Sequence, residues 1–455
     1  MIGERIRLKG PLPCGITLLL VILTAVPAIV SAVTLDECIG LALKQNPDIE
    51  IAARRIEAAE AKIKQAAAAY YPRVTLSSSY TRTSNPPQAF MMKLNQKSLD
   101  MMSPGFDPNN PDDTGNIRTS LGFKYRLYDF GRREADYLMA QGGRSIAAEE
   151  LAAVRNGMIY RITDYFYSAL QADSFVSVQE KSVESLRESL RVARERFSAG
   201  TAIKTDVLNL EVKLAQAQED LIKAKNGVML AVAALNTLIG SEAVAVEDIC
   251  HCETFDNIPA LVGYEPDDAE HRPEMKMARM MRSISEQNLK KTKREYAPAL
   301  NAFGSLDWDG EDLGDTEQSY LVGAQIEWDI FTGFYRYHTI IDARAALEAA
   351  RAETRKMRNR LLLDLQESYL LAVEARERLD VSRKIVHSAE EALRITQERY
   401  LHKAADITEL LTAEVGLTAI RTRAAAAYYD YLKALANMER AKGVLVSRHA
   451  TDSPE

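Results

Sequence analysis

The stretch that decides the fold runs from Ile117 to Leu127 and reads Ile-Arg-Thr-Ser-Leu-Gly-Phe-Lys-Tyr-Arg-Leu. Its odd-numbered positions are mainly apolar, and its even-numbered positions carry arginine, serine, glycine and lysine. Successive side chains of a strand point to opposite faces, so this stretch predicts a strand with one apolar face and one charged face. A strand of about ten residues with this pattern is typical of a transmembrane barrel.

Three other stretches alternate in the same way, although the first of them is more polar. Trp308 and Trp328, the only two tryptophans, lie near predicted strand ends, where the interfacial aromatic side chains of a membrane barrel gather. A small sheet packed on helices would also give a period of two, and any one strand alone favours that alternative. The predicted strands are about 73–83, 117–129, 299–308 and 319–331.

The second half of the chain repeats the first. Tyr71-Pro72 recurs as Ala297-Pro298, and Arg196-Phe197 recurs as Arg399-Tyr400. The first half has an extra segment near 85–115 that is rich in Pro, Asn, Asp and Ser, which predicts a long surface loop. Each half therefore has the order helix, strand, loop, strand, very long helix, turn, long helix, and the fold class is α+β, mostly α and internally duplicated.

The long helices are too long for a globular core. The helix predicted from Arg132 to about Ser198 contains no proline, although Gly142, Gly143 and Gly157 are expected to weaken it locally. At about 1.5 Å per residue it would be roughly 100 Å long, so such rods must pack side by side. Apolar residues step alternately by three and four positions in both halves, which predicts one antiparallel coiled-coil hairpin in each.

The N-terminus predicts export. Arg5, Arg7 and Lys9 precede a short apolar run, and small residues end at Ala32, as in a secretory signal that is cleaved there; an uncleaved anchor is the alternative. The net charge of −7 argues against a nucleic-acid-binding protein. The predicted domain organisation begins with a signal peptide at 1–32 and a first repeat at 33–240, which contains a hairpin at about 132–238. An equatorial linker follows at 241–268. The second repeat, at 269–443, contains a hairpin at about 335–443, and a C-terminal tail covers 444–455.

Cysteine usage leaves two interpretations open. Cys38 and the Cys250-His251-Cys252 triplet can form a disulfide in an oxidising compartment, with one thiol left over, or remain as thiols. Cys250, His251 and Cys252 are also weak candidates for a soft metal, but three adjacent residues rarely supply a complete coordination geometry. We therefore expect no metal and no other cofactor.

The strands also predict assembly. Backbone groups in hydrocarbon need hydrogen-bond partners, so a spanning sheet must close on itself. Four strands cannot close, because the smallest such barrels use eight. Several copies must therefore contribute, and closed rotational symmetry is the default.

The chain resembles the TolC family of outer-membrane efflux proteins. The similarity rests on an ordered set of motifs, namely Thr34–Ile39, Asn46-Pro47, Tyr71-Pro72, Phe130–Arg132 and Arg196–Gly200. The resemblance implies a homotrimer with a 12-stranded outer-membrane barrel that continues into a long periplasmic α-helical barrel. It also implies docking to a periplasmic adaptor (membrane fusion) protein and an inner-membrane pump.

The resemblance places the periplasmic entrance at the two hairpin turns. Glu409 and Asp206 match acidic residues that follow the turns in the family, and Asp406 lies beside the second turn. These three residues are therefore candidates for a gate that constricts the periplasmic entrance. The family often has a second acidic residue after the second turn, and this chain has Thr412 at that position. A ring of Glu409 carboxylates would favour cations, whereas Glu409 and Asp406 alternatively serve as favourable charges at a helix N-terminus.

The same turns are the expected surface for adaptor docking, and their geometry is expected to differ. The first turn has Gly200 where the second has Lys403, which puts the usual turn geometry in doubt for the second. The candidate docking residues are Ala199, Gly200, Thr201, Lys403 and Ala404.

The expected function is a passive exit duct of a tripartite efflux or type I secretion system, located in the outer membrane and extending into the periplasm. The alternative is a soluble periplasmic coiled-coil scaffold or adaptor. An enzyme is not expected, because the sequence shows no phosphate-binding loop, paired-cysteine zinc framework or nucleophile elbow. The sequence does not specify the cargo, the pump or the adaptor.

Overall fold

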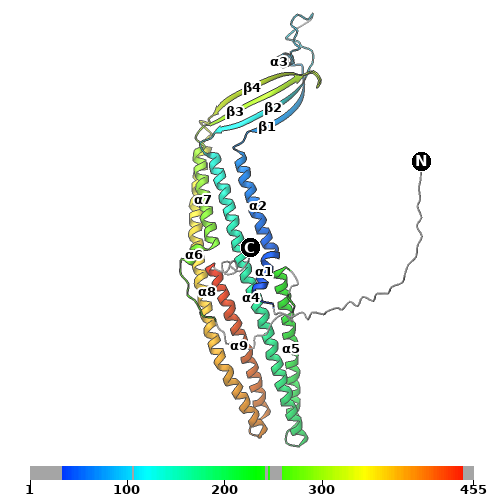
Figure 1. Cartoon of the computed structure of the whole chain (residues 1–455), viewed down its shortest axis with the longest axis vertical. Coiled ribbons are helices and arrows are strands. Elements are labelled where there is room, and N and C mark those ends of the chain that lie inside the picture. The colour runs from blue at the N-terminus through cyan, green and yellow to red at the C-terminus, as the bar shows by residue number, and fades with distance from the viewer. Residues whose placement is uncertain (1–32, 105–106, 241–243, 246–258, 444–455) are drawn as a thin grey trace, which may run out of the picture.

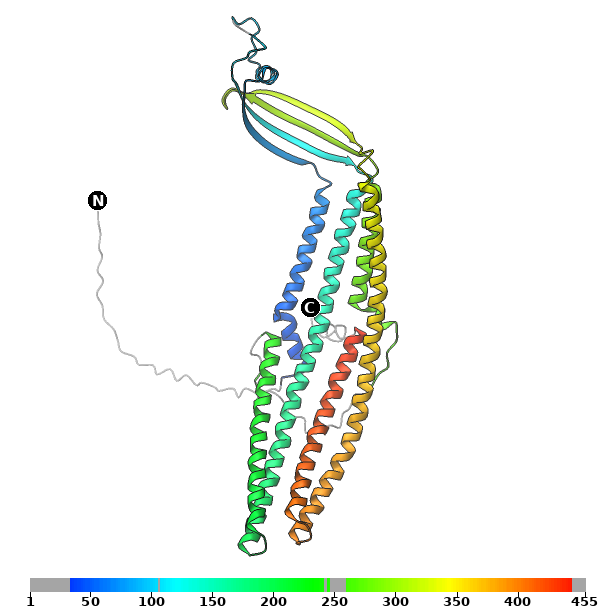
Figure 2. The same ribbon diagram turned by 180° about the vertical axis from the view of Figure 1, so that it is seen from behind.

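The computed structural model describes residues 33–104, 107–240, 244–245 and 259–443. Long helices run side by side along one axis, and a single sheet lies at one end of them (Figures 1 and 2). The protein is therefore mostly helical, as expected. The predicted signal peptide and tail, and most of the predicted linker, lie outside the described residues.

Two helices precede the first strand because Asn46-Pro47 interrupts the helical run. The backbone of Asn46 is extended, its side chain accepts a hydrogen bond from the Asp48 amide, and its Nδ2 donates to the Leu238 carbonyl over 2.7 Å. Pro47 takes the first helical position, where no amide is needed. The first half contains α1 (Leu35–Gln45), α2 (Pro47–Ala68), β1 (Arg73–Thr83), α3 (Pro86–Asn95), β2 (Thr114–Tyr128), α4 (Arg132–Ser198) and α5 (Lys204–Ile239).

The second half has the same long elements in the same order. Its two long helices match those of the first half in length, 67 residues for α4 and α8 and 36 for α5 and α9. It contains α6 (Asp268–His271), α7 (Pro273–Arg294), β3 (Ala299–Gly310), β4 (Glu317–Glu327), α8 (Tyr335–Leu401) and α9 (Ile407–Lys442).

Two expectations differ from the structure. The segment predicted as a loop contains helix α3, which starts at Pro86 in the position that proline favours. Strand β4 ends at Glu327 rather than at 331, and Trp328 instead donates its indole N–H to the Tyr296 carbonyl. Helix α4 has the predicted bounds, and at Gly142 a Cβ would approach Ile284 to within 2.8 Å, so glycine permits close packing of α7.

The four strands form one antiparallel sheet in the order β1-β2-β3-β4. Leu121 is the partner of Leu76 on one side and of Leu306 on the other, and Leu306 is the partner of Tyr320. The apolar positions of all four strands therefore share one face. The register shifts between Arg126 and Tyr128, where β2 has an irregularity before the chain enters α4.

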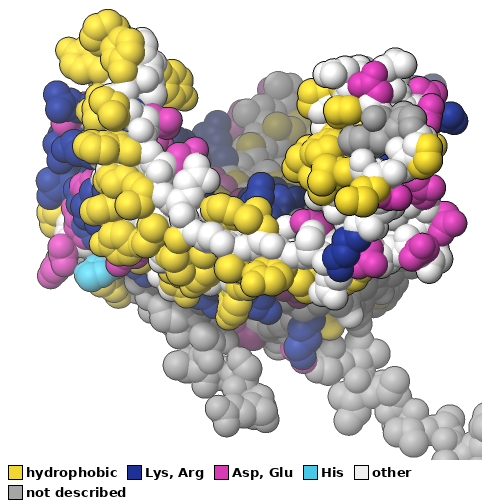
Figure 3. All heavy atoms as spheres, turned by 90° about the horizontal axis from the view of Figure 1, so that it is seen from above, with side chains coloured by type: hydrophobic (Ala, Val, Ile, Leu, Met, Phe, Trp, Pro, Cys, Tyr) yellow, Lys and Arg dark blue, Asp and Glu magenta, His cyan; other side chains and the backbone are white. Residues whose placement is uncertain are grey.

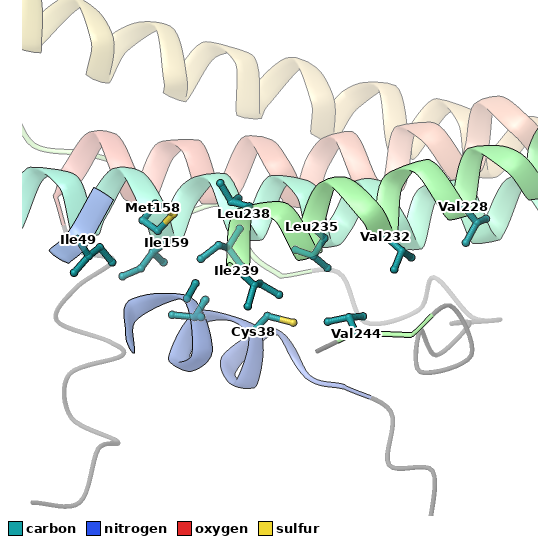
Figure 4. Close-up of a cluster of buried hydrophobic side chains, with 13 residues drawn as sticks. Cys38, Ile49, Met158, Ile159, Val228, Val232, Leu235, Leu238, Ile239 and Val244 are labelled. Atoms are coloured by element: carbon teal, nitrogen blue, oxygen red, sulfur yellow. The ribbon is translucent and has the colours of Figure 1, made fainter. Parts of the chain in front are cut away.

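The helical region is stabilised by separate apolar clusters along its length. One cluster joins α1, α4 and α5 and includes Cys38, Ile159 and Leu235 (Figure 4). Another lies near the far ends of both hairpins and brings together Leu190 of α4, Leu210 of α5, and side chains of α8 and α9. Because this second cluster spans the two halves, the hairpin ends pack as one unit.

An ion network joins the helices of the second half. The guanidinium of Arg272 is buried and donates to Asp364 over 2.5 Å and to Glu274 over 2.8 Å. Arg440 of α9 donates to the other oxygen of Asp364 over 2.8 Å. Burial opposes ionisation of Asp364, but the hydrogen bonds from Arg440 and Arg272 outweigh it and hold the pKa of this carboxyl below its usual value.

Candidate functional site

One face of the sheet is apolar, and no described segment of the chain covers it. Leu76 and Val322 each expose 69% of their surface, and Tyr320 exposes 79%. Such a patch on a single chain marks a surface that contacts lipid or another protein. From above, the sheet is a curved wall beside a hollow, with hydrophobic side chains gathered along the wall (Figure 3). The exposed members of this face are Val74, Leu76, Tyr80, Leu121, Phe123, Leu306, Tyr320, Val322 and Ile326.

The opposite face of the sheet carries the charges of the described strands except that of Arg82, which lies near the end of β1 on the apolar side, and they are sorted by strand. Strands β1 and β2 contribute only cations to this face, and β3 and β4 contribute only anions. Hollows on this side are lined by residues such as Arg73, Lys124, Phe303 and Gln325. The charged residues of this face are Arg73, Arg118, Lys124, Arg126, Asp307, Asp309, Glu317 and Glu327.

A buried polar cluster fixes α3 to the end of the sheet. Asp309 is fully buried and accepts from Asn116 Nδ2 over 2.6 Å and from Arg118 Nε and Nη2 over 2.9 and 3.1 Å. Gln96, just after α3, donates to the Asn116 side chain over 2.9 Å and to the Gly115 carbonyl over 2.8 Å. The segment after β1 is therefore held against the charged face, a contact that the alternation in the sequence does not reveal.

The two hairpin turns have the same backbone geometry, so the expected difference between them is wrong. In the first, Gly200 has φ +71° and the Thr201 amide donates to the Arg196 carbonyl over 2.8 Å. In the second, Lys403 has φ +63° and the Ala404 amide donates to the Arg399 carbonyl over 2.7 Å. Both are Schellman motifs, and lysine adopts the left-handed conformation that usually favours glycine.

One arginine ties the first turn to the second. Arg196 Nη1 donates to the Tyr400 carbonyl over 2.6 Å, and its guanidinium carbon lies 4.6 Å from the centre of the Tyr400 ring. Burial raises the pKa of the Tyr400 hydroxyl, and this oxygen has no hydrogen-bond partner within the described part of the chain. Arg196 and Tyr400 therefore hold the two hairpin ends together through the ring face and the backbone.

The acidic gate candidates all lie where the second helix of each hairpin begins. Asp406 is the N-cap of α9 and accepts from the Glu409 amide over 2.7 Å, while Glu409 pairs with Arg399 over 3.1 Å. Asp206 lies in the first turn of α5. The position of Asp406 agrees with the alternative in which these charges stabilise helix starts.

Glu414, which the sequence analysis did not single out, is the buried carboxylate of this region. It is 3% exposed and accepts from Ser185 of α4 over 2.6 Å and from Gln397 of α8 over 3.3 Å. Burial raises its pKa, and the hydrogen bonds from Ser185 and Gln397 offset only part of this effect. A glutamate five residues after Glu409 on a helix gives no signal in the sequence that it is buried.

The metal and disulfide hypotheses are left open by the structure. Cys250, His251 and Cys252 lie outside the described residues, and the described residues contain no group of three or more metal-ligating side chains that could hold a metal ion. Among the described residues Cys38 forms no disulfide; its thiol is buried, and burial raises its pKa to about 11. The thiol is therefore protonated at neutral pH.

Helix α5 has an exposed apolar side. Among the described helices it alone is long and apolar enough to cross a bilayer by length and composition, yet only 28% of its most apolar window is buried. Its exposed side chains, Leu208, Val212, Ile222, Met229 and Leu230, form a second apolar surface, which lies in the half of the molecule far from the sheet (Figure 1).

The family comparison agrees with these features. The model of the outer membrane efflux protein family matches residues 38–241 and 267–444. The chain is 22% identical to nodulation protein T of Rhizobium leguminosarum bv. trifolii, over 88% of this chain and 83% of that protein. It is 20% identical to the alkaline protease secretion protein AprF of Pseudomonas aeruginosa (72% and 69%) and 20% identical to the outer membrane protein TolC of Vibrio cholerae (67% and 72%).

Solved structures share the fold. The outer membrane protein VceC of Vibrio cholerae matches with a TM-score of 0.74 at 18% identity, over 90% of this chain and 96% of that chain. The open state of the MtrE outer membrane channel of Neisseria gonorrhoeae matches with a TM-score of 0.75 at 17% identity, over 90% and 88%. The chain belongs to the outer membrane efflux protein family, and its place is the outer membrane. The expected class is confirmed in preference to the soluble scaffold or adaptor.

Proposed function

We propose that three copies of this chain form a homotrimer whose sheets close into a 12-stranded barrel in the outer membrane. The observation that carries the proposal is the four-stranded sheet with one uncovered apolar face and two free edges. In hydrocarbon those edges need partners, and copies related by rotation supply them. The charged face then lines the lumen.

The helices below the sheet would continue the conduit into the periplasm. Helices α4 and α8 are equal in length, and so are α5 and α9. These equal lengths support an internal duplication in which each half supplies one helical hairpin to the wall of a helical barrel. The exposed apolar side of α5 supports packing against a neighbouring copy, since closed assembly would cover it.

The assembled trimer would act as the passive exit duct of a tripartite efflux or type I secretion system. The name of one relative, an alkaline protease secretion protein, supports export as the shared role. We assign adaptor docking to the hairpin turns, at Ala199, Gly200, Thr201, Lys403 and Ala404, because they lie together at the end far from the sheet (Figure 1). The pump and adaptor would supply energy and choose the cargo.

The gate would lie at the same end, with Glu409 as its acidic member and Asp406 and Asp206 beside it. The ion pair of Glu409 with Arg399 would leave only part of its charge for the lumen. Replacing Glu409 with alanine should relieve block of single-channel current by divalent cations, and Arg399→Ala should strengthen that block. Unchanged block in both variants would remove Glu409 from the gate.

The function itself is tested by fractionation and conductance. The mature protein should fractionate with the outer membrane, migrate as a heat-modifiable trimer and conduct ions in planar bilayers. A soluble scaffold would instead remain in the aqueous fraction as a monomer without conductance. That outcome would refute the proposal.

A further inference from the structure

We propose that neighbouring copies join in one register, with Arg73 at the start of β1 opposite Glu327 at the end of β4 of the next copy. The inference rests on the proposed function and adds to it the residues that make the seam between subunits. The partner is a second copy of this chain, and the surface comprises the two free edges of the sheet.

The two edges match in length and direction. Strands β1 and β4 each contain 11 residues, and each pairs with only one neighbour in the described sheet. All neighbouring strands are antiparallel, so β1 and β4 run in opposite directions. Closure therefore sets β1 of one copy antiparallel to β4 of the next, with the start of one strand beside the end of the other.

The charge of Arg73 is unbalanced within one copy. Arg73 is the direct cross-strand partner of Lys124, and its side chain forms no hydrogen bond or ion pair with the described residues. Like charges directly opposite each other destabilise a strand pair. On the far edge, β4 begins with Glu317, which pairs with Lys97, and ends with Glu327, which accepts only a 3.4 Å hydrogen bond from Asn301 among the described residues; both lie on the charged face. The anion that Arg73 lacks therefore lies on the edge that the next copy presents.

The pairing of Arg73 with Glu327 also aligns the rest of the seam. It sets Thr83 opposite Glu317, so all 11 positions of each strand have partners. Charged-face positions meet charged-face positions, and apolar positions meet apolar ones. A slip by one residue would turn apolar side chains into the lumen. The apolar rows are Val74 with Ile326, Leu76 with Ala324 and Tyr80 with Tyr320.

Slips by two residues keep the faces but leave unpaired positions. One slip sets Arg73 opposite Gln325 and leaves Glu327 without a partner. The other sets Arg73 opposite Asp329, beyond the end of β4, and leaves Glu317 with no β1 residue opposite it. The three registers can therefore be separated by experiment.

Cysteine pairs separate the registers directly. Thr75 and Gln325 are opposite each other in the proposed register. The slip that sets Arg73 opposite Gln325 instead sets Thr75 opposite Gly323. The slip that sets Arg73 opposite Asp329 sets Ser77 opposite Gln325. Within one copy β1 and β4 are three strand spacings apart, roughly 14 Å, which is too far for a disulfide. Any bond between these cysteines therefore joins two copies.

We expect the Thr75→Cys/Gln325→Cys variant to give a ladder of covalent dimer and trimer on non-reducing gels after mild oxidation. The offset pairs Ser77→Cys/Gln325→Cys and Thr75→Cys/Gly323→Cys should give at least fivefold less, and single-cysteine variants control for other contacts. A stronger ladder from either offset pair would overturn the register while leaving the channel intact. Loss of the protein from the outer membrane in the parent would instead refute the proposed function.

Charge exchange tests the ion pair. Arg73→Glu and Glu327→Arg should each reduce the heat-resistant trimer severalfold, and the two together should restore it to within twofold of the parent. Lys124→Glu is the matched control, because it lies in the same row one strand inward and should not be rescued by Glu327→Arg. The ion pair is ruled out if both single variants retain the parent's heat resistance or if the double variant shows no recovery.

Discussion

The contact between Arg196 and Tyr400 should decide how tightly the hairpin ends stay together. Arg196 reaches from the first turn to the backbone of the second, where its guanidinium donates to the Tyr400 carbonyl over 2.6 Å and covers the ring. Replacing Arg196 with alanine removes both interactions and leaves the turn itself intact, because that turn is closed by backbone hydrogen bonds.

The magnitude follows from the two interactions. A hydrogen bond from a charged donor contributes about 1.5–3 kcal/mol, and a cation–π contact at a partly exposed site about 0.5–1 kcal/mol. Water would replace part of the lost hydrogen bond at this end of the molecule, so we expect a net loss of about 2 kcal/mol per copy. That loss corresponds to a roughly 30-fold rise in the ratio of separated to closed hairpin ends.

Single-channel recording in planar bilayers is the assay. Arg196→Ala should raise the open probability by about an order of magnitude or more, and Arg196→Lys should lie between the alanine variant and the parent, because lysine keeps the charge without the planar fork. Tyr400→Phe is the control, since the Tyr400 hydroxyl has no hydrogen-bond partner in the described structure and phenylalanine keeps the ring and the carbonyl. If Arg196→Ala conducts like the parent while Tyr400→Phe opens the channel, the reasoning is wrong.

Three further predictions concern buried polar groups. Burial raises the pKa of Glu414, so ionisation of this side chain destabilises the fold as the pH rises above about 4. Glu414→Gln should therefore raise the Tm at pH 7 and leave the Tm unchanged below about pH 4. The pKa of Asp364 is lowered, so its ionised side chain stabilises the fold at neutral pH, and this stabilisation is lost as the pH falls below about 4. Asp364→Asn should lower the Tm at pH 7, where Arg272 loses a charged partner, and the difference in Tm from the parent should shrink in acid. Asp309→Asn should weaken the cluster that holds Gln96, so proteolysis between 97 and 113 should increase severalfold, whereas equal cleavage would show that α3 is held by other contacts.

The sequence predicts the strands and hairpins well because their physics is local. Alternation in β2 depends only on which side of a strand each residue faces, and the register through Leu76, Leu121 and Leu306 brings those apolar positions together. The heptads specify long helices in the same way. Helix α3 was missed because proline at its start was interpreted as a loop signal, although proline also favours a helix start.

The site was less predictable because its contacts join residues far apart in the chain. Arg196 donates a hydrogen bond to the Tyr400 carbonyl, and Glu414 accepts one from Ser185, so both bonds join the two halves of the chain. No local pattern distinguishes a buried glutamate from an exposed one on a helix. The replacement of Gly200 by Lys403 in the second half suggested a difference between the turns that the structure does not have. Backbone hydrogen bonds impose the left-handed conformation on Lys403 as on Gly200.

Equivalent arginines in the two halves have different partners, and this difference bears on how the hairpin ends separate. Arg196 donates across to Tyr400 of the other hairpin, whereas Arg399, at the equivalent position, donates to Ala404 of its own turn and pairs with Glu409 of its own hairpin. The turn of the second hairpin is therefore closed on itself, and of these two arginines only Arg196 joins the hairpins, beside the apolar cluster that they share. If the ends separate at Arg196, the second hairpin can move as a preformed unit, with its turn, its N-cap Asp406 and its Glu409 pair unchanged.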